Sequence, residues 1–181
     1  TVTAFLFVGL VGRPFWNAAI VAPRFLGSAF TAGPGILIIT FWLLAKITHV
    51  KVGDKPINLL RNIVTASLLV NLFMLFCEAF KEFYSDALHN ASAKYLFFGL
   101  HGHDRLVPFI WTAIALECIA ACILVIPPLA RKRMLLNLAC LLSIVGIWIE
   151  KGMGLVIPGF IPTPLGNVVE YMPTLNESLI C

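Results

Sequence analysis

Three carboxylates interrupt apolar stretches of this sequence and could carry proton chemistry. Glu78, Glu117 and Glu150 each stand within or at the end of an apolar run whose length approaches the thickness of a lipid bilayer. An ionisable side chain at the centre of a membrane helix costs about 2.5 to 3.5 kcal/mol on insertion scales, so it usually faces protein or a water-filled path. A carboxyl group in such a place can bind and release a proton, so proton transfer is the first chemistry that these residues indicate.

Glu117 stands near the middle of its apolar run. Its neighbours four residues before it and three and four residues after it are alanines: Ala113, Ala120 and Ala121. Such a face is narrow and lets another helix approach closely, so we expect Glu117 to point into a helix bundle. Two interpretations stay open: a protonated side chain that hydrogen-bonds a neighbouring helix, or a proton relay.

A polar stripe is expected on the preceding apolar run. At 100° per residue, Ser67, Asn71 and Glu78 lie within about 40° of one another on a helix. The stripe predicts either hydrogen bonds between helices or a path for water or a polar ligand. Asn71, Glu78 and Glu117 are therefore candidates for a proton path.

A histidine-rich segment stands directly before the apolar run that begins at Leu106. It contains His101, His103 and Asp104. Histidine titrates near neutral pH and a neighbouring carboxylate can orient it, which suits coupled proton and electron transfer. The alternative is an ordinary solvated entry to a helix.

Ligands for a metal cofactor are scarce in the apolar runs. None of the four histidines falls inside one, and no two cysteines have the spacing Cys-X-X-Cys. Haem within a membrane and iron–sulfur clusters need histidine or clustered cysteine ligands. We therefore expect this chain to bind no metal, haem or iron–sulfur cluster itself, so that electron transfer would need a bound carrier and a partner subunit.

The composition indicates a membrane protein. Of the 181 residues, 60% are hydrophobic and 12% are charged, against roughly 45 to 50% and about 25% in soluble domains. The basic residues are scattered, so nucleic-acid binding is not expected. We predict an all-α, polytopic transmembrane helix bundle, with residues 1–181 forming a single membrane domain that is an internal part of a longer protein. About five spans are expected, at residues 1–12 (partial), 26–46, 63–80, 106–126 and 134–150.

The distribution of lysine and arginine predicts the orientation. Seven of the thirteen fall in the two loops 46–62 and 127–133. These loops are separated by two spans and so lie on one side, which should be cytoplasmic because cytoplasmic loops hold an excess of basic residues. The histidine-rich segment and the proline-rich stretch that follows Glu150 should then cap the outer face.

Small residues at Gly27, Thr31 and Gly35 predict a helix that packs closely against its neighbours.

Several stretches together resemble a known family. They are residues 13–17, 23–26, 28–30, 95–99, 101–105, 148–152 and 158–164. These stretches resemble the NrfD family of polysulfide-reductase-type membrane anchors over essentially the whole chain, most closely its DsrP branch, the quinol-interacting subunit of the sulfite-reductase-associated complex of sulfate reducers.

This resemblance implies an integral subunit without cofactors of its own in the prokaryotic cytoplasmic membrane. It would bind menaquinol near the outer face and pass electrons to iron–sulfur and cytochrome partner subunits in anaerobic respiration. By position, the candidates for the quinone head-group pocket are Arg24, His101, His103, Asp104 and Glu150. The alternatives are a secondary transporter or ion path that uses the buried polar groups, and a purely structural anchor for a peripheral enzyme.

Overall fold

The computed structural model describes residues 2–48, 53–84, 90–161, 163 and 166–168. These residues form seven α-helices, followed by one turn of π-helix and one of 3₁₀-helix, and no strand occurs among them. The elements are α1 (Val2–Val8), α2 (Val21–Ile47), α3 (Asp54–Tyr84), α4 (Ala91–Phe98), α5 (Val107–Val125), α6 (Pro127–Ala130), α7 (Arg133–Lys151), η2 (Gly152–Val156) and η3 (Pro158–Phe160). The predicted all-α bundle is confirmed.

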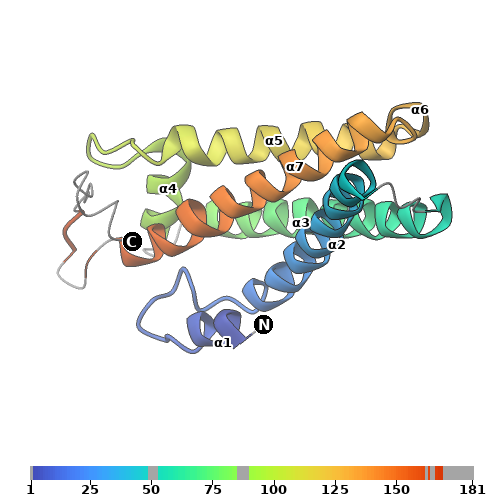
Figure 1. Cartoon of the computed structure of the whole chain (residues 1–181). Coiled ribbons are helices and arrows are strands. Elements are labelled where there is room, and N and C mark those ends of the chain that lie inside the picture. Colours follow the sequence, from blue (N-terminus) through green and yellow to red (C-terminus); the bar gives the residue numbers. More distant parts are fainter. Residues whose placement is uncertain (1, 49–52, 85–89, 162, 164–165, 169–181) are drawn as a thin grey trace.

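Four helices, α2, α3, α5 and α7, are long and apolar enough to cross a membrane, and they form the bundle seen in Figure 1. The shortest two, α5 and α7, have 19 residues each, or about 28 Å at 1.5 Å per residue. That length matches a hydrocarbon core of roughly 30 Å. Large apolar side chains such as Phe73, Phe76 and Trp148 are more than half exposed on their outer faces, as expected of surfaces that contact lipid.

Two of these helices are longer than the hydropathy predicted. α2 begins at Val21 and α3 at Asp54, five and nine residues before the expected starts at 26 and 63. Hydropathy detects the part of a helix that lies in hydrocarbon, whereas a helix can continue into the polar region around it. Pro23 and Pro56 fall in the first turns, where a backbone N–H has no partner within the helix in any case.

The predicted partial span at residues 1–12 is helical only over α1, which has seven residues. Backbone hydrogen bonds from Gly9 to Phe5 and from Leu10 to Phe7 then end the helix in a turn. Seven residues span about 10 Å, so α1 does not cross a bilayer by itself. A helix that was not predicted, α4, occupies part of the expected connection 81–105.

The two predicted basic loops lie at the same end of the bundle (Figure 1), which we call the basic end. There Arg133 Nη2 at the start of α7 lies 2.6 Å from Asp54 Oδ1 at the start of α3. The prediction that both loops lie on one side of the bundle is confirmed, while the cytoplasmic location of that side remains a prediction. Residues 49–52 of the first loop lie outside the described residues.

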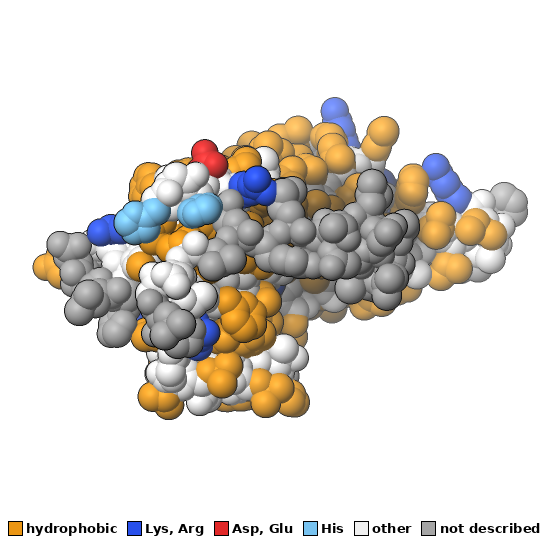
Figure 2. Space-filling view, turned by 90° about the vertical axis from the view of Figure 1, so that its left-hand side faces the viewer, with side chains coloured by type: hydrophobic (Ala, Val, Ile, Leu, Met, Phe, Trp, Pro, Cys, Tyr) orange, Lys and Arg blue, Asp and Glu red, His pale blue; other side chains and the backbone are white. Residues whose placement is uncertain are grey.

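At the opposite end, which we call the cap end, α4 and the segment between α1 and α2 meet the segment that follows α7. Ser92 at the start of α4 donates a hydrogen bond to the Ile161 carbonyl. The indole N–H of Trp16 donates to the Leu155 carbonyl at 2.8 Å, and its ring packs against Gly159. Figure 2 looks onto this end and shows histidine, lysine and arginine side chains among apolar ones. The proline-rich stretch therefore packs on the bundle as far as Ile161, and residues 169–181 lie outside the described residues.

Two apolar clusters fill the bundle, with buried polar side chains between them. The cluster at the cap end includes Trp16, Tyr95 and Ile110, and the cluster toward the basic end includes Leu68 and Leu136. The helices approach one another through small residues, as predicted. Gly27 lies against the Ser67 backbone on α3, and Gly35 lies against Cys140 on α7. We call the buried polar side chains between the two clusters the polar layer.

Replacing Trp16 by phenylalanine is expected to lower the free energy of unfolding by about 1 to 2 kcal/mol, because the buried Leu155 carbonyl loses its donor. Thermal unfolding of the purified protein in detergent measures the change. Trp148→Phe is the matched control, since Trp148 is 67% exposed and should change little. Equal losses in the two variants would contradict the importance of this hydrogen bond.

Candidate functional site

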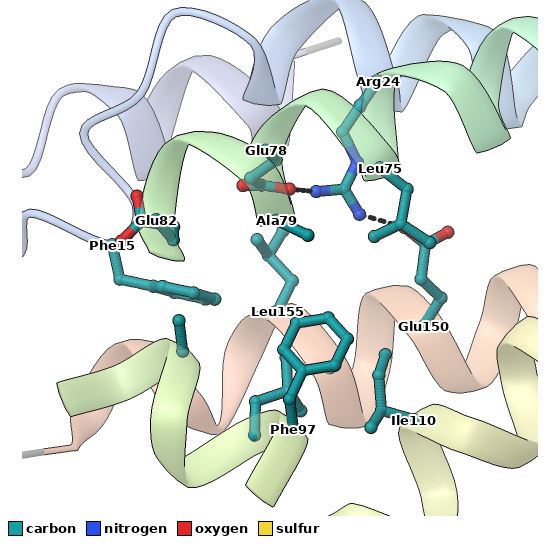
Figure 3. Close-up of a pocket in the computed structure, with 13 residues that line it drawn as sticks. Phe15, Arg24, Leu75, Glu78, Ala79, Glu82, Phe97, Ile110, Glu150 and Leu155 are labelled. Carbon is teal, nitrogen blue, oxygen red and sulfur yellow. Dashed lines mark hydrogen bonds and ion pairs between the residues drawn. The ribbon is translucent and has the colours of Figure 1, made fainter. Parts of the chain in front are cut away.

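Arg24 is the centre of a buried ionic cluster between three helices. It belongs to the first turn of α2 and is only 4% exposed. Its Nη1 pairs with Glu78 of α3 and its Nη2 with Glu150 of α7, as the dashed lines in Figure 3 show. A guanidinium presents several N–H donors in a fixed plane, so one arginine can bind two carboxylates at once. Arg24 therefore links α2, α3 and α7 at the cap end.

Lys151 supplies a second cation. Its Nζ lies 3.0 Å from Glu150 Oε1, the same oxygen that Arg24 contacts. The amine also lies over the ring of Phe25, 5.6 Å from its centroid, in a cation–π arrangement. Glu150 is 1% exposed, and these two cations compensate its charge.

Asn71 connects this ionic cluster to Glu117. Its Nδ2 lies 3.2 Å from Glu117 Oε2 and 3.2 Å from Glu150 Oε2. A side-chain amide has two N–H donors, so it can serve both carboxyl groups together. Asn71 stands seven residues before Glu78 on α3, and Glu117 lies at the middle of α5. The polar chain thus runs from the cap end to the middle of the bundle.

The charges of this network balance only if one carboxyl group is neutral. It contains the two cations Arg24 and Lys151 and the three carboxyl groups Glu78, Glu117 and Glu150. Glu117 is fully buried and contacts neither cation in the ion pairs described. An uncompensated buried charge is costly, so Glu117 is the member expected to carry a proton at rest.

Three buried polar atoms of this network have no hydrogen-bond partner in the described part of the chain. They are Arg24 Nε, Asn71 Oδ1 and Glu117 Oε1. A buried group without a partner costs about 1 to 3 kcal/mol, and each such group calls for a specific explanation such as a water molecule or a ligand. Each of these atoms can therefore form a further hydrogen bond, to a water molecule or to a group that exchanges a proton.

Gly146 of α7 allows α5 to approach at Glu117. A Cβ atom at Gly146 would lie 2.8 Å from Glu117 Cγ and 3.2 Å from the Ala113 carbonyl oxygen. Ala113 and Ala120 are fully buried on the same face. The narrow helix face predicted from the alanines around Glu117 is therefore confirmed, and Gly146 is the residue that fits against it.

A small cavity adjoins the cluster. Its volume is about 20 Å³, which is room for about one water molecule. The lining residues are Phe15, Arg24, Leu75, Glu78, Ala79, Glu82, Ala93, Leu96, Phe97, Ile110, Glu150, Gly154 and Leu155. In Figure 3, Glu82 lies beside the Phe15 ring, Glu78 lies beside Arg24, and the Phe97 ring lies on the opposite side of the space from Arg24. The cavity can hold a water molecule beside the ion pairs but not a quinone ring.

The structure regroups the predicted site residues. Arg24 and Glu150, expected in the head-group pocket, share one network with Asn71, Glu78 and Glu117, expected in a proton path. The separation of these residues into two sites is thus not observed.

The histidine-rich segment lies apart from this network. A backbone bridge joins Leu100 to His103. Gly99 precedes it and Gly102 lies within the turn that it closes, with φ of 81° and 84°. This tight turn leaves His101 and Asp104 exposed and His103 half-buried. None of the three lines the cavity. Their expected place in one pocket with Arg24 and Glu150 is therefore not observed.

Comparison with known families identifies the chain. The sequence model of the family described as "Polysulphide reductase, NrfD" matches residues 1–162. The chain belongs to the NrfD family. Comparison with curated proteins and with solved structures gives no significant match. NrfD proteins are membrane subunits of quinol oxidoreductase complexes and work with iron–sulfur subunits and quinol, and the apolar helices of this member make it a multi-pass membrane protein.

Two ionisable members of this NrfD site were not predicted. Glu82 lines the cavity four residues after Glu78, and this spacing places both on one helix face. Lys151 belongs to the stretch 148–152 that resembles the family but was not predicted as a site residue, although it stands next to Glu150 and can serve as its counterion. Thr31 extends the polar layer by one more contact, since its hydroxyl donates to Ser67 Oγ at 3.0 Å.

In the described residues, no three histidine, cysteine or carboxylate side chains are grouped so that they could hold a metal ion. The free cysteines Cys118 and Cys122 are exposed on α5, and Cys140 is buried in the apolar cluster toward the basic end. The expectation that this NrfD chain binds no cofactor of its own stays a prediction.

Proposed function

We propose that this chain is the quinol-interacting membrane subunit of a menaquinol-linked oxidoreductase complex in anaerobic respiration. It lies in a prokaryotic cytoplasmic membrane, with loops 46–62 and 127–133 on the cytoplasmic side and the cap end outward. Quinol is oxidised near the cap end, and the electrons pass to an iron–sulfur subunit, with a cytochrome subunit beyond it. A role in sulfite or sulfate reduction follows from the resemblance to the DsrP branch.

The observation that carries this proposal is the buried network of ionisable side chains at the cap end of an NrfD chain. Oxidation of one quinol breaks two O–H bonds and releases two electrons and two protons. The partner's iron–sulfur centre takes the electrons, and the protons need acceptors close to the head group. Glu150 and Glu78 are carboxylates at the cap end, and in this proposal they take up the protons although their ion pairs with Arg24 favour the charged form.

Asn71 and Glu117 extend the proposed proton path. Asn71 contacts both Glu150 and Glu117, and Glu117 Oε1 has no partner. A proton can therefore exchange between Glu150 and Glu117, with a water molecule filling the remaining gap. In this proposal, Glu117 stores a proton in the middle of the bundle.

A secondary transporter or ion path is less well supported. The polar layer ends at Thr31 and Ser67. Beyond it, toward the basic end, the described residues form an apolar cluster around Val64, Leu68 and Leu136, all less than 5% exposed. A transporter needs polar groups along its whole path, and this apolar cluster interrupts them, with Asn137 Nδ2 buried beside it without a hydrogen-bond partner in the described part of the chain.

Glu117→Gln tests the proposal in the complete complex. Glutamine keeps the shape and the acceptor for Asn71 but cannot carry a proton, so quinol oxidation should fall at least about tenfold, with the unfolding temperature nearly unchanged. Ser143→Ala is the matched control, because the Ser143 hydroxyl is equally buried and bonds only the Cys140 carbonyl of its own helix.

A titration with a menaquinol analogue, made on the complex with its partner subunits, completes this test. Saturable binding by the wild type and lost turnover in Glu117→Gln are expected. Absence of any binding would overturn the quinol proposal. Binding together with unchanged turnover in Glu117→Gln would show that the network has a purely structural role.

A further inference from the structure

A groove between α2 and α7 lies next to the ionic network on the outer surface of the bundle. It is lined by Ala32, Ile144, Ile147, Trp148, Lys151 and Gly152, and its volume is about 290 Å³. All of its lining side chains except Lys151 are apolar or absent. Trp148 and Gly152 are exposed, so the groove opens on the outer, apolar surface of these helices.

Lys151 separates this groove from the buried network. Its amine contacts Glu150 Oε1 at 3.0 Å, while the residue lines the groove and its side chain is 13% exposed. A molecule in the groove would thus lie one side chain away from Glu150. Toward the basic end the groove closes where Gly35 of α2 packs on Ile144, since a Cβ there would lie 3.6 Å from Ile144 Cδ1.

The sizes of the two spaces decide where a head group fits. The internal cavity of about 20 Å³ holds one water molecule. The groove of about 290 Å³ approaches the range of roughly 300 to 1,000 Å³ that is typical of sites for organic ligands. An organic head group therefore fits in the groove and not in the internal cavity, and a ligand that arrives in the groove from the membrane must itself be lipid-soluble.

We propose that the α2–α7 groove is the binding site of the lipid-soluble quinone, with Lys151 as the hydrogen-bond donor to a ring oxygen. This inference rests on the proposed function and assigns the place and the polar contact of its substrate. The apolar tail lies along Ala32 and Ile144, and the head group lies at Lys151 and Gly152. Lys151 has three N–H donors and can keep its contact with Glu150 while it binds the ring oxygen.

Ala32→Trp tests the groove by filling it. In the complete complex, the Kd for a menaquinol analogue should rise at least tenfold. Gly33→Trp is the matched control on the next residue of the same helix, because Gly33 is exposed and a Cβ there meets nothing within 4 Å. Its Kd should stay within twofold of the wild type.

Lys151→Met and a photoreactive menaquinone analogue give a second test that does not depend on the folding of Ala32→Trp. Lys151→Met should raise the Kd about tenfold, and Lys151→Arg should recover most of the affinity because it restores a charged donor. In the wild type, the cross-links should map to peptides of α2 and α7 that line the groove.

The outcomes distinguish an error in the groove assignment from an error in the proposed function. If the wild type binds the analogue but Ala32→Trp binds it equally well, or if the cross-links fall on other helices, the groove assignment is wrong while the quinol function stands. The same conclusion follows if Gly33→Trp weakens binding as much as Ala32→Trp. If the wild type shows no saturable binding, both the function and the groove assignment fail.

Discussion

Replacement of Arg24 by methionine is expected to lower the free energy of unfolding by about 3 to 5 kcal/mol, the cost typical of removing one partner from a buried ion pair. Arg24 is 4% exposed and compensates two carboxylates at once. Without it, Glu78 loses its buried cation, and Glu150 keeps only Lys151. Quinol turnover in the complete complex should be lost together with stability, because the acceptors at the cap end lose their arrangement.

Unfolding in detergent, followed by temperature or denaturant, measures this effect. The double variant Arg24→Met with Glu78→Met should be more stable than Arg24→Met alone, since it removes the carboxylate that the single change leaves uncompensated. Arg133→Ala is the control, because its ion pair with Asp54 is exposed and is expected to contribute about 0 to 1 kcal/mol. If Arg24→Met costs no more than Arg133→Ala, the ionic cluster does not hold the helices together.

Gly146→Val is expected to cost about 3 kcal/mol, the upper part of the range for overpacking a well-filled interior. The first added carbon would already lie 2.8 Å from Glu117 Cγ and 3.2 Å from the Ala113 carbonyl oxygen. The second contact is with backbone, so a side-chain rotation cannot relieve it and α5 must move away from α7. That movement would also displace Glu117 from Asn71.

The matched control is Gly33→Val, where the side chain enters open space. It should change the unfolding free energy by less than about 1 kcal/mol. Adding Glu117→Ala to Gly146→Val should recover part of the loss, because it removes the closer of the two contacts. Equal stability of Gly146→Val and the wild type would show that α5 and α7 do not pack this closely.

The sequence alone predicted the four long helices because a bilayer imposes a length and a composition on any helix that crosses it. It did not predict where α2 and α3 begin or that α4 exists, because helices outside the hydrocarbon need no apolar run. In the same way, a carboxylate in an apolar run must be accommodated by protein, so Glu78, Glu117 and Glu150 could be selected as site residues without a structure.

The grouping of these residues depends on which helix faces meet, and that is decided by tertiary packing. Arg24 could be selected by position, but nothing in the chain indicates that it lies between Glu78 and Glu150. The expected pocket joined His101 to Arg24 because both belong to the same end. His101 and His103 instead belong to the turn at Gly99 and Gly102 and do not line the cavity beside Arg24.

The polar chain runs from the cap end to the middle of the bundle, so the proton exchange that we propose for Glu117 would be sensitive to membrane voltage. Glu117 lies near the midpoint of α5, its hydrogen bond with Asn71 leads toward the cap end, and an apolar cluster lies in the other half. A proton that moves between Glu117 and the water at the cap end therefore crosses roughly half of the transmembrane field. Since a full crossing is worth about 2.3 kcal/mol per 100 mV, half of it changes the proton occupancy several-fold. The membrane potential would thereby regulate quinol turnover through Glu117 without any ion crossing this subunit.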